Sequence, residues 1–138
     1  MSSDRKLKHL EICRDKDVRA RRETTHLDDV TLIHSAAPEL NFSEIDLETR
    51  LFGKTLAAPL LISAMTGGHP ATKKVNENLA KAAKSVGIGM CVGSQRAAIE
   101  DPRMAETFSV VRDVSQEMLV IGNIGAPQLI SGDAADYA

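Results

Sequence analysis

The sequence is poor in aromatic residues and cysteines, and it contains no long apolar run. Tryptophan is absent, and aromatic residues make up only 3% of the 138 residues. Cys13 and Cys91 lie far apart and outside any C-x-x-C spacing, so neither a disulfide framework nor a metal site is indicated and both are expected to be reduced thiols. No stretch is long and apolar enough to span a bilayer, and no signal-peptide core follows Met1. These absences predict a cytoplasmic protein with no membrane-bound segment.

The remaining composition is typical of one globular domain with a core, at 43% hydrophobic and 26% charged residues. The net charge of -2 is unevenly distributed, because residues 1–22 carry eight Lys or Arg against four Asp or Glu, a local charge of +4 that leaves -6 for the rest. A basic segment of this kind suits phosphate, nucleic acid or an acidic partner. Nucleic acid is the weakest of these, because no aromatic residue interleaves with the basic ones to stack on bases.

The basic segment has a thin apolar stripe that indicates a short helix, with Asp4 as its predicted N-cap. In a helix, Arg5 and His9 would lie on one face with Lys6 beside them. A planar Arg fork, a Lys point charge and a His donor together suit a diphosphate. For this basic motif taken alone, a solvated tail is the more common explanation.

Two short β elements are predicted before the main repeat. Residues Leu27–His34 alternate in the manner of a strand, and Ile45–Leu56 is predicted to form a β-hairpin with Gly53 and Lys54 at its turn. His26 and His34 are interpreted as structural or solvent-facing residues. These elements are expected to flank or plug one end of the fold.

From Pro59 onward, buried strands alternate with amphipathic helices. The predicted elements, in order, are a strand Leu60–Ile62, a helix Ala71–Val86 ended by Gly87, a strand Ile88–Val92, a helix from about Asp101 to about Asp113 with Pro102 at its first position, a strand Leu119–Ile121, and the first turns of a helix at Asp133–Ala138. The strand starts are 28 and 31 residues apart, which is the period of a βα unit in a parallel sheet.

Eight such units would span roughly the 250 residues usual for a (β/α)8 or TIM barrel, which buries its strands on both faces. Three strands alone would leave apolar edges bare. The predicted fold class is therefore α/β, the N-terminal part of a TIM (β/α)8 barrel preceded by a basic segment and a short β-hairpin. Residues 1–26 are expected to be a mobile basic N-terminal segment, and residues 27–138 the first part of a truncated barrel. A small doubly wound domain is the alternative.

Polar or small residues follow all three predicted strands, at Ser63–Gly68, Gly93–Arg96 and Asn123–Gly125. In a parallel barrel these ends share the C-terminal rim, where ligands bind. A Ser94 hydroxyl and an Asn123 amide suit a flat, polar-edged cofactor with a phosphate tail better than a metal, and no His, Asp or Glu set has ligand spacing.

Structural alternatives stay open at each of these positions. The Gly67-Gly68 pair could form an ordinary βα turn, Arg96 could form a salt bridge at the rim, and Asn123 could be a turn residue. His69 is interpreted as a loop residue.

Five motifs occur together and in order along the chain. They are R-K-x-x-H at Arg5–His9, Thr25-His26-Leu27-Asp28-Asp29, A-M-T-G-G at Ala64–Gly68, G-S-Q-R at Gly93–Arg96, and N-I-G at Asn123–Gly125. In this combination the sequence resembles type 2 isopentenyl diphosphate isomerases. The pairing of A-M-T-G-G with G-S-Q-R at this spacing is the most specific part of the resemblance.

The resemblance implies a TIM-barrel flavoenzyme that interconverts isopentenyl and dimethylallyl diphosphate with reduced FMN, Mg²⁺ and NADPH, without net redox change. It implies that the substrate is held by Arg5, Lys6, His9, Ser94, Gln95 and Arg96. It implies that FMN is contacted by Ala64, Met65, Thr66, Ser94 and Asn123. It also implies a homo-oligomer, a tetramer or an octamer. No residue is assigned as the catalytic acid or base.

In that family the Mg²⁺-binding motif and the loops for the FMN phosphate lie beyond the position of Ala138. The 138-residue chain alone is therefore expected to lack isomerase activity and to bind FMN weakly or not at all. An FMN-dependent oxidoreductase on the same barrel, such as a 2-hydroxyacid oxidase relative, is the alternative enzyme. A non-enzymatic phosphate-binding or assembly fragment is a third possibility.

Overall fold

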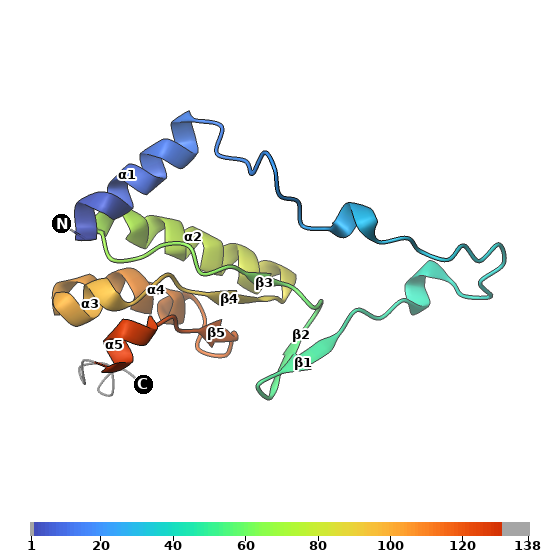
Figure 1. Cartoon of the computed structure of the whole chain (residues 1–138). Helices are drawn as coiled ribbons and strands as arrows, with labels where there is room; N and C mark the ends of the chain where they lie inside the picture. Colours follow the sequence, from blue (N-terminus) through green and yellow to red (C-terminus); the bar gives the residue numbers. More distant parts are fainter. Residues whose placement is uncertain (1, 131–138) are drawn as a thin grey trace.

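A three-stranded parallel sheet lies at the centre of the structure, a computed structural model that describes residues 2–130 (Figure 1). Its strands, in the spatial order β3-β4-β5, are β3 (Leu61–Ile62), β4 (Gly89–Cys91) and β5 (Val120–Ile121). The register pairs Ile62 with Met90 and Met90 with Val120. The predicted strand–helix–strand repeat is confirmed. Within residues 2–130 the sheet is open and not a closed barrel.

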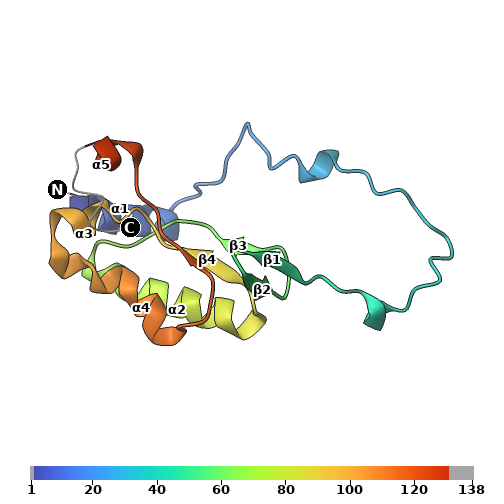
Figure 2. The same cartoon turned by 90° about the horizontal axis from the view of Figure 1, so that it is seen from below.

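Two helices, α2 (Pro70–Val86) and α4 (Glu106–Val114), connect the strands and pack against the same face of the sheet (Figure 2). The core between these layers contains fully buried Met90 and Val111, with Ile62 and Val120 packed beside them. The alternate strand residues are directed to the other face, where Leu61 is 38% exposed. One face of the sheet is therefore covered by helices, and the other is open in residues 2–130.

Helix α2 closely matches its prediction, because its apolar residues recur at helical spacing and its ends carry clear signals. Gly87 ends the helix in the left-handed conformation, at φ 71°. His69 is more than the loop residue that was predicted, since its Nδ1 accepts a hydrogen bond from the Ala71 N–H at 3.1 Å and so caps the helix.

The helix predicted from about Asp101 to about Asp113 is confirmed only from Glu106 onward, as α4. Its first turn is a separate 3-10 turn η3 (Pro102–Met104), and the short helix α3 (Arg96–Glu100) before it was not predicted. Asp101 separates α3 from η3 and is extended at φ -145°, because a residue before proline avoids the helical region. The Asp101 carboxylate accepts the Arg103 N–H at 3.1 Å and begins the 3-10 turn, with Pro102 in its first position as predicted.

The N-terminal part begins with helix α1 (Ser2–Asp15), as the apolar stripe predicted. The helix begins at Ser2, so Asp4 lies in its first turn and is not the N-cap. A long exposed arm, residues 16–48, then runs away from the sheet and returns (Figure 1). It contains the 3-10 turns η1 (Leu27–Asp29) and η2 (Phe42–Glu44).

The strand predicted at Leu27–His34 is wrong. Its first residues form η1, and the rest of the segment pairs with no strand among the described residues. Ile33 is 98% exposed, so the alternating apolar side chains have no surface to cover. Alternation indicates a strand only where a neighbouring backbone supplies the ladder.

The hairpin prediction is confirmed over a shorter span, with β1 (Thr49–Leu51) pairing antiparallel to β2 (Lys54–Leu56). The turn residues are Phe52 and Gly53, both at positive φ, and Lys54 already belongs to β2. The Ala57 N–H donates to the Gly87 carbonyl at 2.8 Å, which attaches the hairpin to the end of α2.

After β5 the chain forms the short helix α5 (Ala126–Ile130). The helix predicted at Asp133–Ala138 lies outside the described residues. Within residues 2–130, no helix has both the length and the apolar character needed to cross a membrane.

Gly68 and Gly53 provide a matched test of how closely the loop after β3 packs against α3. Both have left-handed φ, at +85° and +75°, but a Cβ at Gly68 would lie 2.4 Å from the Ala97 Cβ, whereas nothing lies within 4 Å at Gly53. We expect Gly53→Ala to lower the free energy of unfolding by about 1 kcal/mol. Gly68→Ala should lower it by about 1–3 kcal/mol more, because Ala97 must move. Urea unfolding followed by circular dichroism measures both, and equal losses would contradict the close contact.

The exposed face of α2 has a pH-dependent ion-pair cluster. Hydrogen bonds from Lys81 and Lys74 lower the pKa of Glu77 to about 2. Because this pKa is lower in the folded than in the unfolded state, ionised Glu77 stabilises the fold above about pH 4.5, and the stabilisation is lost as the pH falls towards 2. Glu77→Gln should therefore lower the urea midpoint at pH 7 but not near pH 2. The difference at pH 7 should shrink in about 1 M salt, which screens exposed charges.

Candidate functional site

The C-terminal ends of the three parallel strands meet at one edge of the sheet, as predicted. Two backbone hydrogen bonds join the loops that follow them. The Gly93 N–H donates to the Thr66 carbonyl at 2.9 Å, and the Gln95 N–H donates to the Asn123 carbonyl at 2.9 Å. Residues about thirty positions apart in the chain are therefore assembled into one rim.

The loop after β3, residues 63–69, provides the first wall of this rim. Ala64 is half-buried and Met65 is 66% exposed, whereas Thr66 is 8% exposed. Gly93 allows the second loop to approach, because a Cβ there would lie 2.5 Å from the Thr66 carbonyl oxygen. The rim is thus built from closely spaced backbone.

The loop after β4 contributes Ser94, Gln95 and Arg96. Ser94 and Gln95 are half-buried, and Arg96 is exposed in the first turn of α3. The Arg96 Nε lies 2.6 Å from the Glu100 Oε1, so the rim salt bridge left open by the sequence is present. Charge on Arg96 is partly balanced by this neighbour.

The loop after β5 contributes Asn123, whose side chain is exposed. The preceding Gly122 lies against Gln95, because a Cβ at Gly122 would be 3.0 Å from the Gln95 Oε1. The second loop therefore contacts both the first and the third. These loops contain all the site residues predicted for the strand ends: Ala64, Met65, Thr66, Ser94, Gln95, Arg96 and Asn123. Their binding roles stay predictions.

The three basic residues of the N-terminal motif all belong to α1, which contacts α2. Figure 1 shows the first turns of α1 near the start of α2, at the same end of the molecule as the strand tips. Arg5 and His9 are exposed, and Lys6 is half-buried. Burial, together with the positive charge of Arg5, lowers the pKa of Lys6. The positive charge of Arg5 therefore lies close enough to Lys6 to act on it.

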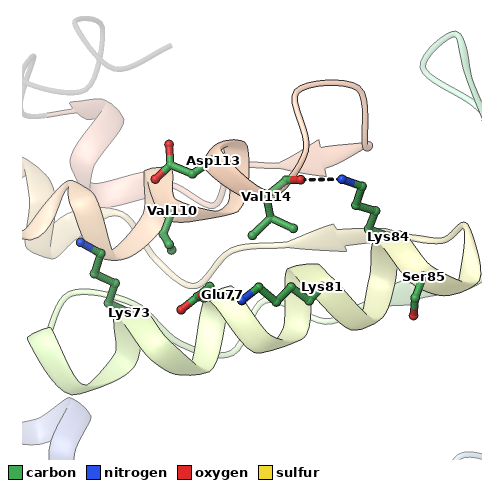
Figure 3. Close-up of a pocket in the computed structure, with 8 residues that line it drawn as sticks. All are labelled: Lys73, Glu77, Lys81, Lys84, Ser85, Val110, Asp113 and Val114. Carbon is green, nitrogen blue, oxygen red and sulfur yellow. Dashed lines mark hydrogen bonds and ion pairs between the residues drawn. The ribbon is translucent and has the colours of Figure 1, made fainter.

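A hollow of about 740 Å³ lies apart from this rim, between the outward sides of α2 and α4 (Figure 3). Most of the charged groups on its walls, those of Lys73, Glu77, Lys81 and Lys84, already have partners. Lys73 pairs with Glu106 at 2.7 Å, and the Lys84 Nζ donates to the Val114 carbonyl at 3.0 Å. The hollow is a solvated surface of α2 and α4, and none of the residues that line it belongs to the strand-end loops.

Two buried polar residues next to the rim escaped the sequence analysis. Asn76 and Thr107 are each 1% exposed, and they lie on the core-facing sides of α2 and α4. The Gly68 N–H donates to the Thr107 Oγ1 at 2.8 Å, and the Asn76 amide donates to the Thr107 and Thr66 carbonyls at 2.8 and 3.3 Å. A polar residue in the apolar stripe of each predicted helix was the available signal.

The described residues contain no group of three or more His, Cys, Asp or Glu side chains that could hold a metal ion. The acidic side chains near the rim, such as Glu100 and Asp101, are each paired with an arginine.

Comparison with known proteins agrees with this arrangement. Residues 2–115 match the family model described as FMN-dependent dehydrogenase. The chain is 52% identical over 128 residues to a protein of Methanococcoides burtonii named isopentenyl-diphosphate delta-isomerase, covering 93% of the chain and 35% of that protein. Proteins of the same name from Archaeoglobus fulgidus and Methanothermobacter thermautotrophicus are 51% and 43% identical, each over 129 residues, which is 94% of the chain and 37% of each protein.

The chain spans about a third of the length of these curated relatives. The family model, in contrast, covers most of the chain and includes the first two strand ends of the rim. The chain therefore belongs to the FMN-dependent dehydrogenase family.

Proposed function

We propose that this chain forms the first part of a (β/α)8 barrel in an isomerase that interconverts isopentenyl and dimethylallyl diphosphate with the help of reduced FMN. The observation that carries the proposal is the convergence of three strand-end loops, rich in glycine and small polar residues, beside a helix with a cationic face. The relatives named isopentenyl-diphosphate delta-isomerase support this choice of reaction.

The sheet itself supports the barrel. Strands β3, β4 and β5 are neighbours in chain order, and both connecting helices cover one face. A doubly wound sheet would place helices on both faces. In the described residues β3 and β5 each pair on one side only, which leaves edges for further strands. We keep residues 1–26 as a basic N-terminal segment and 27–138 as the first part of the barrel.

The rim fits a flat cofactor. The contacts proposed for FMN are made by Ala64, Met65, Thr66, Ser94 and Asn123. The missing Cβ of Gly93 lets its loop pack directly on the Thr66 backbone, which fixes these two loops against each other beside the place proposed for the planar ring. When bound, reduced FMN would supply a group that helps one carbon of the substrate to gain a proton and another to lose one, which shifts the double bond. The chain's own contribution is to orient the ring and exclude water above it.

The cationic face of α1 fits the diphosphate. Arg5 offers a fork, His9 a further donor, and half-buried Lys6 a charge whose pKa is lowered by burial and by Arg5. Ser94, Gln95 and Arg96 would reach the substrate from the rim. A diphosphate between these groups would be held at one end while its alkene lies over the flavin ring.

Other parts of the proposal rest on the sequence. The use of Mg²⁺ and NADPH and the assembly into tetramers or octamers come from the resemblance, whereas a cytoplasmic location and the absence of nucleic-acid binding come from the composition. Residues 2–130 contain no set of acidic and His side chains that fits a metal ion. We therefore assign no step of the reaction to Mg²⁺.

An FMN-dependent oxidoreductase is the second candidate, favoured by the family's own description as dehydrogenases. It would use the same strand-end contacts with the cofactor but would not need the Arg5-Lys6-His9 cluster. The two functions therefore differ in what the N-terminal helix does.

A hybrid protein tests the proposed reaction. In it, this chain replaces the matching third of the Methanococcoides burtonii relative. We expect the hybrid to be yellow with bound FMN and to convert isopentenyl diphosphate into dimethylallyl diphosphate once the flavin is reduced. The 138-residue chain alone should show neither activity nor tight FMN binding. A hybrid that binds FMN and oxidises a 2-hydroxyacid without isomerase activity would support the oxidoreductase instead.

Charge removal on α1 tests the diphosphate contact. In the hybrid, Arg5→Ala and Lys6→Ala should each raise the KM for isopentenyl diphosphate by about tenfold or more, because a charge-assisted contact contributes about 1.5–3 kcal/mol. The dissociation constant of FMN should not change. Lys8→Ala removes the same charge from an exposed position on the same helix and serves as the control. An equal KM increase in that control would indicate a diffuse charge effect.

A further inference from the structure

The loop after β3 is held from behind by two side chains that lie outside the rim. Thr107, on α4, accepts the Gly68 N–H at 2.8 Å and donates to the Met104 carbonyl at 2.7 Å. Asn76, on α2, donates to the Thr107 carbonyl at 2.8 Å and to the Thr66 carbonyl at 3.3 Å. The network thus joins both connecting helices to one loop.

Both side chains are costly at their positions unless these bonds form. Asn76 and Thr107 are each 1% exposed and lie beside an otherwise apolar core. An amide or hydroxyl buried without a partner destabilises a fold, whereas a bonded one fixes its partner's orientation. Here the partners are backbone groups of Thr66, Gly68, Thr107 and Met104, the last of these at the end of η3, so the network specifies the path of the loop.

The held segment is one that would otherwise be mobile. Gly67 and Gly68 have φ of +140° and +85°, values that few residues other than glycine adopt. A glycine pair samples many conformations when free, and ordering it on binding weakens affinity for a ligand. Fixing the Thr66 carbonyl and the Gly68 N–H before the ligand arrives removes that cost.

We propose that Asn76 and Thr107 are positioning residues that preorganise the Thr66–Gly68 backbone for FMN. The proposal rests on the proposed function, in which residues 64–66 contact the flavin. Neither side chain touches the cofactor. Each acts through the loop. Asn76 adds a second hydrogen bond to the Thr66 carbonyl, which also accepts from the Gly93 N–H, and Thr107 accepts the Gly68 N–H.

The test compares three variants of the hybrid described above by titration with FMN. Thr107→Val keeps the shape of the side chain and removes both hydrogen bonds, so the dissociation constant for FMN should rise about tenfold. Thr107→Ser restores the hydroxyl and should stay within about threefold of the unchanged hybrid. Val111→Ala is the matched control, because it creates a cavity in the same helix and core and removes no hydrogen bond to the loop. It should lower the urea midpoint but leave FMN affinity unchanged.

A second readout needs no flavin. In the 138-residue chain, amide hydrogen exchange at Gly68 should accelerate at least tenfold in Thr107→Val and by much less in Thr107→Ser and Val111→Ala. Asn76→Ala gives an independent variant if Thr107→Val fails to fold, with the same expected loss of FMN affinity through the Thr66 carbonyl.

The outcomes separate the two hypotheses. A hybrid that does not bind FMN at all contradicts the proposed function, and the positioning role falls with it. FMN binding that is unchanged in Thr107→Val, or weakened equally in Val111→Ala, overturns the positioning role and leaves the proposed function intact.

Discussion

The parallel alignment of β3, β4 and β5 is the constraint on which the rest of the structure depends. Because adjacent strands run in the same direction, all three strands end on the same side of the sheet, and a helix must connect each strand to the next. The connecting helices α2 and α4 cover one face, and the loops that follow the strands gather at their C-terminal ends. The hydrogen bonds from Gly93 to Thr66 and from Gln95 to Asn123 are possible only in this alignment. The rim, the core and the open face of the sheet all follow from the parallel pairing of the three strands.

The fold could be predicted from sequence where a local pattern and its surroundings agreed. Helix α2 has helical spacing, a proline at its start and Gly87 at its end, so its bounds were predicted closely. The helix expected from about Asp101 to about Asp113 was right only from Glu106, because its first turn has the tighter 3-10 form, which apolar spacing does not distinguish from an α-helical turn. The strand expected at Leu27–His34 failed for a different reason. Its pattern was present, but a strand requires a partner that sequence periodicity cannot supply.

The candidate site was predictable to the level of its strand ends. The period of the βα units was sufficient to predict that Thr66, Ser94 and Asn123 lie at the same end of the sheet, because that placement depends on topology alone. Side-chain pairing within the rim was not predictable. Arg96 could be named as a salt-bridge candidate, yet its partner Glu100 became evident only with helix α3. Asn76 and Thr107 were missed because a polar residue in an apolar stripe reveals its partner only when two helices are packed against a loop.

The order of the strands in space has a consequence for how the polypeptide acquires its shape. Each strand pairs with the one made immediately before or after it, and no described strand of this sheet is completed by a distant segment. Pairings of this short sequence separation close small loops, which lowers the entropic barrier to their formation. A ribosome-bound chain could therefore build the sheet one βα unit at a time, in the order of translation. While the sheet forms, the uncovered side that includes Leu61 presents apolar surface of the kind that chaperones bind.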